Sequence, residues 1–215
     1  MMAVSTTRRA FLAGSGAALL TSAALASGGS ATRVFGIWRD GSEIGEQRLE
    51  ARLTDRGFEI DIKADIAVKL LGLTAYRYTL ENREVWRDRR IVSVDSSCND
   101  DGDREYARVR RRDDRLEIDA SGYSGTQPLE AVTTSYFAPA FRGRTPWIST
   151  QSGKPLDIRV DKRGADTWAV RGDLTVDLTY RDGEWRGAEF TIDGDRIVYE
   201  TQRSTGEIAQ LWRQA

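Results

Sequence analysis

Residues 58–66 read Phe-Glu-Ile-Asp-Ile-Lys-Ala-Asp-Ile, so that apolar and charged side chains alternate at nearly every step. Successive side chains of a β-strand point to opposite faces of the sheet, and this alternation therefore predicts a strand with one buried and one solvated face. The same period of two returns at residues 116–120 and 174–180, and helical spacing is almost absent from residues 32–203. The sequence thus predicts an all-β fold.

Turn signals separate these runs at short, regular intervals. Asp-Gly pairs, as at residues 40–41, favour the positive φ angles that tight hairpin turns require. The other signals lie at residues 55–57, 71–72, 88, 101–102, 113–114, 163–164, 171–172, 182–183 and 193–194. We expect about ten to twelve antiparallel strands in a curved meander sheet that closes into a barrel or half-barrel.

Two segments break this rhythm. Residues 122–155 hold all four prolines of the chain, interleaved with glycines and aromatic residues. Such a long connection is either a plug packed over the core or a functional loop. At the C-terminus, residues 204–207 (Ser-Thr-Gly-Glu) fit a capping box. Ile208, Leu211 and Trp212 then fall on one face of a short C-terminal helix.

The N-terminus carries the sequence of an export signal. Arg8 and Arg9, followed by Phe11 and Leu12, match the twin-arginine motif of bacteria. The uncharged run over residues 13–25 is shorter than the ~20 residues that span a bilayer. We expect the twin-arginine translocase to carry the chain to the periplasm, and a membrane-anchoring N-terminal helix is the alternative.

Small residues at positions 24 and 26 predict cleavage after Ala26, with a mature start at Ala31 as the alternative. The predicted organisation is a signal peptide over residues 1–26, a flexible segment over residues 27–32 and a single all-β domain over residues 33–215. Cleavage removes two arginines and no acidic residue, which moves the formal net charge from −1 to −3. A faintly acidic chain argues against nucleic acid as a partner. We expect no stable membrane span in the mature form.

The residue inventory excludes several chemistries. The chain has no histidine, which excludes Ser-His-Asp and Cys-His catalytic arrangements and His-based metal or haem sites. Cys98 is the single cysteine, so no intramolecular disulfide can form, and a quiet buried thiol is expected there. We predict neither a cofactor nor a metal.

A series of short motifs points to a known family. They are Phe35-Gly36-Ile37, residues 40–45 (Asp-Gly-Ser-Glu-Ile-Gly), Tyr76-Arg77-Tyr78, Glu84-Val85-Trp86, residues 99–102 (Asn-Asp-Asp-Gly), residues 150–154 (Thr-Gln-Ser-Gly-Lys), Glu184-Trp185 through Phe190, and Ile197-Val198-Tyr199. In this order they resemble a domain of unknown function found in exported proteins of proteobacteria. The likeness covers residues 33–200 and implies export and an all-β domain, with no established activity. Relatives have a Trp-Asn pair where this chain has Tyr136-Phe137-Ala138, so a role tied to that Asn does not carry over.

The aromatic loop is the site that we expect to carry function. The predicted ligand-binding residues are the walls Tyr136, Phe137, Phe141 and Trp147 and the polar handle formed by Gln151 and Lys154. Aromatic walls with an amide and an ammonium at the rim are typical of a pocket for an amphipathic ligand. The alternative is a core plug, in which the aromatic rings seal one end of the sheet.

Three further clusters of charged residues have a purely structural interpretation as well as a functional one. The acid-rich turn over residues 95–105 offers oxygen ligands for calcium, but Arg108 falls where an EF-hand needs its bidentate Glu, which favours a solvated hairpin turn. Arg108, Arg110 and Arg112 share one face of a strand and either bind an anion or pair with neighbouring acids. The carboxylates considered for a catalytic pair are Glu81, Glu84, Asp95, Glu184 and Glu189.

The sequence therefore favours a non-catalytic periplasmic protein that binds a lipid-like or other amphipathic small molecule. A carboxylate-dependent hydrolase of envelope glycans is the enzymatic alternative, and no catalytic constellation is recognisable for it. A structural or protein-interaction module that binds a partner at an edge strand is the third possibility.

Overall fold

The computed structural model describes residues 29–215 except 71–72 and 193. The predicted export motif at Arg8, Arg9, Phe11 and Leu12, together with the cleavage site after Ala26, lies outside the described residues. In the part of the chain that is described, no helix has the length and apolar character needed to cross a bilayer.

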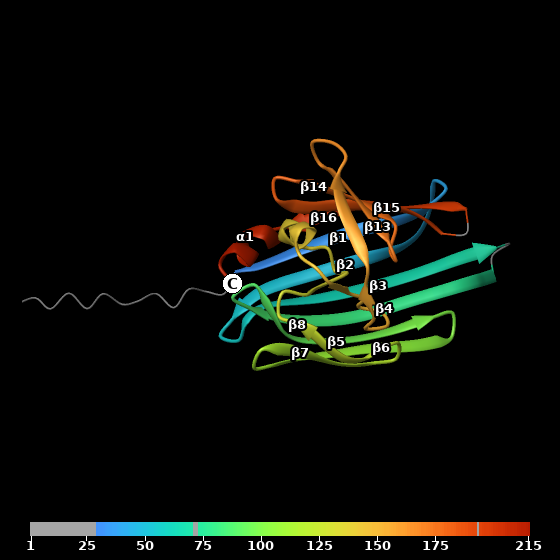
Figure 1. Ribbon diagram of the computed structural model, residues 1–215. Helices are drawn as coiled ribbons and strands as arrows, with labels where there is room; N and C mark the ends of the chain where they lie inside the picture. The colour runs from blue at the N-terminus through green and yellow to red at the C-terminus, as the bar shows by residue number, and fades with distance from the viewer. Residues whose placement is uncertain (1–28, 71–72, 193) are drawn as a thin grey trace, which may run out of the picture.

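Thirteen strands form one antiparallel sheet in the order β12-β13-β14-β15-β16-β1-β2-β3-β4-β5-β6-β7-β8 (Figure 1). Their bounds are β1 Ser30–Arg39, β2 Ser42–Thr54, β3 Gly57–Leu70, β4 Leu73–Arg87, β5 Arg90–Asp100, β6 Asp103–Arg112, β7 Arg115–Ala120, β8 Ser124–Pro128, β12 Ile158–Lys162, β13 Thr167–Gly172, β14 Val176–Arg181, β15 Glu184–Ile192 and β16 Asp195–Thr205. The loop holds a three-stranded sheet, β9 (Val132–Thr133), β10 (Trp147–Ile148) and β11 (Pro155–Leu156), and a 3-10 helix, η1 (Pro139–Gly143). Helix α1 (Ile208–Arg213) ends the chain. The predicted all-β meander is confirmed, with more strands than expected.

Tight turns make the meander possible. Asp40, Asp88, Asp101, Asp113 and Asp182 all have positive φ and sit between paired strands. Asp tolerates the left-handed region better than most residues because its short side chain hydrogen-bonds locally. These positions are turn signals read from the sequence, and each of them joins two neighbouring antiparallel strands.

The large sheet is not closed, because β12 and β8 are its edges and do not pair with each other. The chain leaves the sheet at β8, and the loop over residues 129–157 crosses the concave side before the chain returns at β12 (Figure 1). Pairing of β16 with β1 joins the two ends of the chain inside the sheet. The architecture is therefore the half-barrel of the two predicted forms.

The predicted flexible segment is shorter than expected. Ser30 begins β1, and Ala31 is buried and paired with Ala51 of β2. Thr32 pairs with both Glu50 and Thr205. Pairing with β2 therefore orders residues 30–32 of the predicted flexible segment, and Thr32 is also held by β16.

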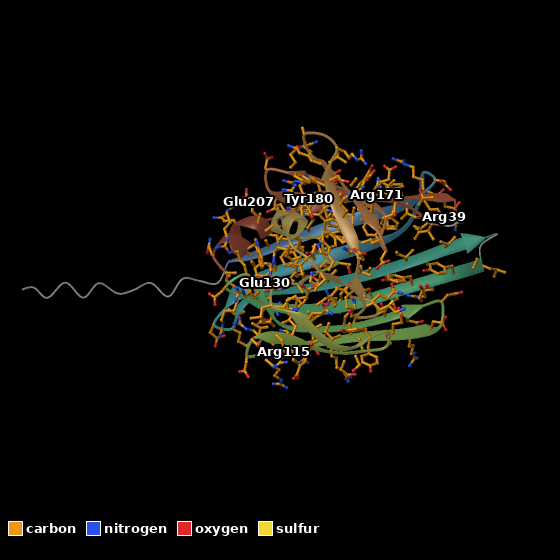
Figure 2. The ribbon with its side chains drawn as sticks, viewed as in Figure 1. Arg39, Arg115, Glu130, Arg171, Tyr180 and Glu207 are labelled. Atoms are coloured by element: carbon orange, nitrogen blue, oxygen red, sulfur yellow. The ribbon has the colours of Figure 1, made fainter. Side chains whose placement is uncertain are left out.

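Figure 2 shows side chains filling the space between the sheet and the loop that crosses it. Aromatic rings from three parts of the chain form the centre of this core. Phe58 and Trp86 come from the sheet, Phe137 and Phe141 from the loop, and Trp212 from α1. Their ring centroids lie 4.9 to 5.9 Å apart, in stacked and edge-on contacts. Such pairs add about 0.5–1.5 kcal/mol each beyond the burial of apolar area. The rings thus bind the loop and the helix to the sheet.

A buried ion pair fixes α1. Arg33 Nη2 lies 2.7 Å from Glu184 Oε2, and the two side chains are 2% and 3% exposed. Glu184 Oε1 also accepts the backbone N–H of Ala209 at 2.6 Å, while Arg33 Nη1 donates to the Trp185 carbonyl. The predicted helix is confirmed, but the capping box is wrong, since the cap residue Glu207 makes no side-chain cap hydrogen bond. Instead, the Glu184 carboxylate on β15 accepts a free backbone N–H at the start of the helix.

Replacing Glu184 by Gln should destabilise the fold by about 3 kcal/mol, because it leaves the Arg33 guanidinium buried without its counter-charge. Urea denaturation of the purified protein measures this change. The matched control is Glu46→Gln, which removes one partner of the exposed Arg203–Glu46 pair and should cost less than about 1 kcal/mol. Equal losses in the two variants would contradict the assignment.

Candidate functional site

The predicted binding residues of the loop divide into two groups. Phe137, Phe141 and Trp147 are fully buried in the core. Trp147 Nε1 donates to the carbonyls of Phe141 and Arg144, so its polar atom is satisfied within the protein. These three rings form the plug that the sequence left open as the alternative. Tyr136, Gln151 and Lys154 are not fully buried, and they are the members of the set that a ligand can reach.

Glu84 ties the loop to the sheet from inside. It is fully buried on β4 and accepts hydrogen bonds from Asn82 Nδ2, Trp86 Nε1 and the hydroxyls of Thr133 and Ser135, at 2.8 to 3.4 Å. Burial raises the pKa of Glu84, and these donors partly offset that rise. The hydrogen bonds that this carboxylate accepts from Thr133 and Ser135 hold the loop against the sheet.

Two arginines hold the loop at its other contacts. Arg144 donates to the carbonyls of Arg89, Leu129 and Glu130. The Arg142 guanidinium lies 3.7 Å from the centroid of the Trp168 ring and 4.8 Å from that of Tyr180. These contacts join the loop to the β4–β5 turn on one side and to β13 and β14 on the other. The loop is therefore a fixed part of the core.

Three tyrosines, Tyr78 of β4, Tyr136 of the loop and Tyr199 of β16, gather on the concave side, and we call them the inner tyrosines. All three are half-buried, and burial is the main cause that raises the pKa of each hydroxyl. Tyr199 further raises the pKa of the other two. Tyr78 and Tyr199 pack against the same cluster of isoleucines, so these two side chains are neighbours. Strand β4 lies four positions from β16 in the sheet, and this proximity follows from the strong curvature. Within the described residues, the hydroxyls of Tyr136 and Tyr199 form no hydrogen bond.

Apolar residues surround the inner tyrosines. Tyr199 packs on Phe190, with 5.5 Å between the ring centroids. A cluster of Ile37, Ile66 and Ile197 contacts Tyr78, Tyr199 and Phe190, and Tyr78 also packs against Ala64, Leu80 and Cys98. This end of the concave face therefore has apolar walls beside the hydroxyls of Tyr136 and Tyr199, while the Tyr78 hydroxyl is engaged with Cys98.

Buried polar side chains lie beside these walls. Asn82 and Ser96 are direct partners across β4 and β5, and both are buried. Asn82 Oδ1 and Ser96 Oγ have no hydrogen-bond partner among the described residues. The neighbours across the sheet are small: Ser96 pairs with Ala107, and Gly153 of the loop packs closely against Ala120 of β7. The sequence analysis missed these residues, although Asn82 and Ser96 stand in phase with the inward apolar positions of their strands.

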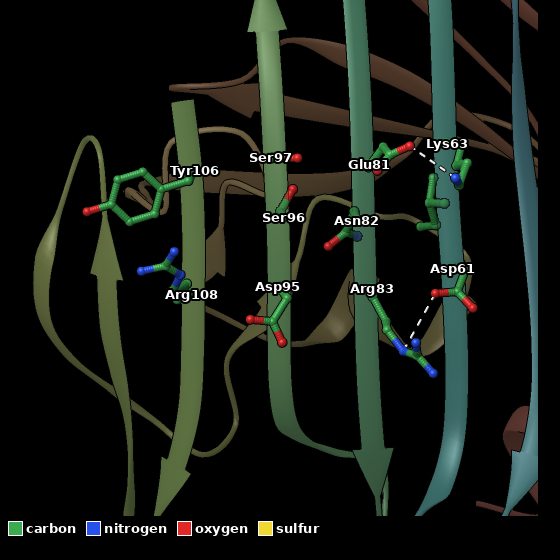
Figure 3. Close-up of a pocket in the computed structure, with 11 residues that line it drawn as sticks. Asp61, Lys63, Glu81, Asn82, Arg83, Asp95, Ser96, Ser97, Tyr106 and Arg108 are labelled. Atoms are coloured by element: carbon green, nitrogen blue, oxygen red, sulfur yellow. Dashed lines mark hydrogen bonds and ion pairs between the residues drawn. The ribbon is translucent and has the colours of Figure 1, made fainter. Parts of the chain in front are cut away.

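The outer face of β3–β6 bears a hollow of about 470 Å³ (Figure 3). Its charged side chains are paired with one another or with close neighbours: Lys63 with Glu81, Arg83 with Asp61 and Glu59, Asp95 with Arg110, and Arg108 with Asp119. A second hollow of about 520 Å³ lies beside β11 and β12, where Pro146, Leu156 and Asp173 contribute to its lining. With its charges neutralised internally, the outer hollow offers no side-chain charge for a ligand.

The acid-rich turn is a hairpin turn, and the arginines of the cluster pair with neighbouring acids. Asn99 Oδ1 accepts the Gly102 N–H at 2.8 Å, and Asp100 accepts the Tyr76 hydroxyl at 2.7 Å, so the turn is braced by its own side chains. Over the described residues, no group of His, Cys, Asp and Glu is arranged to hold a metal ion. In the arginine cluster, Arg112 pairs with Glu117 in the same way as Arg108 and Arg110 pair with their acids.

The considered carboxylates do not form a catalytic pair. Glu84 lies opposite Val94 in the β4–β5 register, so Asp95 projects from the opposite face of the sheet. Glu184 is held by Arg33 and α1, and Glu189 pairs with Arg196 at 2.7 Å. Glu81 and Asp95 both line the outer hollow, where they pair with Lys63 and Arg110, so each of the considered acids has a structural partner.

Comparisons with known proteins agree on the fold and give no activity. A family model described as a domain of unknown function (DUF6134) matches residues 35–202. A solved structure, the beta-barrel-like protein of domain of unknown function DUF1849 from Brucella abortus, matches with a TM-score of 0.56 at 11% identity, covering 81% of this chain and 96% of that chain. No curated protein matches the sequence. The predicted likeness to an uncharacterised all-β family is confirmed.

The outer-face charge network makes stability depend on pH. Burial opposes the ionisation of Glu59, but hydrogen bonds from Arg83, Thr54 and Arg52 outweigh it and lower the pKa of Glu59 from 4.5 to about 2. Because the folded-state pKa is depressed, this contribution is complete above about pH 4.5 and is lost as the pH falls towards 2.

We expect Glu59→Gln to remove about 2 kcal/mol of stability at pH 7 and much less near pH 2. Urea denaturation at a series of pH values measures the difference. Glu81→Gln is the control, since Glu81 and its partner Lys63 are both exposed. A loss in Glu59→Gln that is the same at both pH values would show that the carboxylate charge is not the cause.

Proposed function

The chain belongs to the family described as a domain of unknown function, DUF6134, and we propose that this member binds an amphipathic small molecule on the concave face of its half-barrel, at the inner tyrosines. The observation that carries the proposal is the pair of hydroxyls at Tyr136 and Tyr199, two half-buried residues on the concave side whose hydroxyls form no hydrogen bond to the described residues. Hydroxyls that stay free for a partner beside apolar side chains are typical of a binding site.

The surroundings set the character of the ligand. The rings of Phe190 and Tyr199 and the cluster of Ile37, Ile66 and Ile197 offer an apolar surface. The hydroxyls offer the polar contacts that orient a ligand on such a surface. Of the predicted polar handle, Gln151 is half-buried and Lys154 is exposed. A molecule with an apolar body and a polar end matches this combination.

The structural contacts of the buried carboxylates fit a binding protein better than a hydrolase. Glu84, the deepest of them, has four hydrogen-bond donors and holds the loop, and Glu184 holds α1. A general acid or base needs a free path to the substrate proton, which neither residue has. The proposed role is therefore that of a carrier or sensor of its ligand.

The environment-sensitive probe N-phenyl-1-naphthylamine should bind with micromolar or better affinity and gain fluorescence. We expect Tyr199→Ala to weaken this binding about tenfold, because it removes both ring surface and hydroxyl from the site. Tyr106→Ala is the matched control, since Tyr106 is exposed on the outer face. Equal affinity in Tyr199→Ala and the unaltered protein would contradict this site.

We also propose that the protein acts in the periplasm after export through the twin-arginine pathway. The support is the motif at Arg8, Arg9, Phe11 and Leu12 with the uncharged run that follows it. An amphipathic ligand fits a place between membranes, where such molecules cross an aqueous space.

Changing Arg8 and Arg9 together to Lys should retain the chain in the cytoplasm as an uncleaved precursor, because the receptor reads the guanidinium pair and not the charge alone. Cell fractionation with immunoblotting measures the distribution. Thr6→Ala, next to the motif, is the control and should leave export unchanged. Normal export of the double-lysine variant would contradict the pathway.

A further inference from the structure

Three uncharged polar side chains line the inner face of β2, β4 and β5. Gln47, Asn82 and Ser96 are all more than nine-tenths buried. Each stands in the inward phase of its strand: Gln47 is opposite Ala64, which is in turn opposite Leu80, and Leu80 is two residues from Asn82. The three side chains therefore lie on one continuous patch of the concave surface, next to Tyr78.

The hydrogen-bonding capacity of this patch is largely unspent. Asn82 Oδ1 and Ser96 Oγ have no partner among the described residues, and the amide of Gln47 forms no side-chain hydrogen bond to them either. A buried polar atom left without a partner costs about 1–3 kcal/mol. Two such atoms on one patch, Asn82 Oδ1 and Ser96 Oγ, point to a polar ligand atom that satisfies them.

The loop brings further polar groups to the same patch. Ser135 reaches Glu84, whose other oxygen accepts from Asn82 Nδ2, and Tyr136 follows Ser135 directly in the chain. Gly153 packs closely against Ala120, which is the cross-strand neighbour of Ala107, and Ala107 in turn pairs with Ser96. The patch is thus bounded by the sheet on one side and by the loop on the other.

The buried charges around the patch are negative or neutralised, and Lys154, next to Gly153 in the loop, is exposed. Glu84 is the buried carboxylate beside Asn82, and Glu105 lies opposite Cys98 in the β5–β6 register. The buried cation of the fold, Arg33, is neutralised by Glu184. The inward positions of β2 to β5 that the structure describes hold no Lys or Arg. An anionic head group would therefore enter without a counter-charge and against two carboxylates.

We propose that the ligand of this site carries an uncharged polar end with hydrogen-bond donors, such as the hydroxyls of a glycerol ester or the N–H of an amide, held by Gln47, Asn82 and Ser96. This assignment rests on the proposed binding function and narrows its ligand class to neutral amphiphiles. It separates this protein from carriers of fatty acids or phospholipids, which need a cationic contact for the head group.

Three probes with the same apolar chain test the preference: 1-dodecanoylglycerol, dodecanoate and dodecyltrimethylammonium, each below its critical micelle concentration and in competition with N-phenyl-1-naphthylamine. We expect the glycerol ester to bind at least about tenfold more tightly than either charged probe. Equal or tighter binding of dodecanoate or of the ammonium probe would overturn the assignment. Failure of every probe, the naphthylamine included, would instead overturn the proposed function.

Two variants locate the polar contact. Gln47→Leu should weaken the glycerol ester about tenfold and leave the naphthylamine unaffected, whereas Gln202→Leu, on the exposed side of β16, should change neither. Ser96→Ala should leave the free protein as stable as before or more stable, because its hydroxyl has no partner, and should reduce the thermal shift given by the glycerol ester. An unchanged shift in both Gln47→Leu and Ser96→Ala would show that the patch holds buried water only, and would overturn the proposal.

Discussion

The contact between Trp86 of the sheet, Phe137 and Phe141 of the loop and Trp212 of α1 is the interaction on which the half-barrel depends. A thirteen-stranded sheet with two free edges cannot cover its own concave face. The apolar side chains of that face must be buried against something else, and the only covering available within the described chain is the loop and the short helix. Aromatic rings suit the task because they bury a large area with few rotatable bonds. The hydrogen bonds of Glu84 and Arg144 then fix the position of the loop on the sheet.

The covering is uneven along the strands, and this unevenness defines the site. Reading β4 from its C-terminal end, the inward residues run from Trp86 and Glu84 through Asn82 and Leu80 to Tyr78. The first two contact the plug, and the last is among the half-buried tyrosines near the hairpin end of the strand. One end of the concave face is thus sealed by the loop and α1, while the other keeps polar groups beside apolar walls. The proposed site lies at this less covered end.

The sequence predicts the fold well because two local signals carry it. Alternation around Ile60 and Ile62 sets which face is buried, and the Asp residues at the turns set where each strand ends. Long-range partners have no comparable signal. Whether Phe137 and Trp147 face a ligand or the core depends on how the loop folds back, and the cap of α1 comes from Glu184, 25 residues away in the chain. Both outcomes are decided by tertiary contacts, so local pattern could not choose between them.

A polar residue in the inward phase of an otherwise apolar strand is a signal that could have been read. Asn82 and Glu84 stand between Leu80 and Trp86 with the same period of two, yet they have opposite roles in the structure. Glu84 is saturated with donors and holds the loop, whereas Asn82 keeps its oxygen unpaired. The pattern marks both positions as buried and polar, and only the partners that the fold brings to them separate a structural group from a binding group. The Brucella structure shares the architecture at 11% identity, and a fold alone does not carry a ligand preference. Under the proposed function, that preference depends on the inward polar residues of this chain.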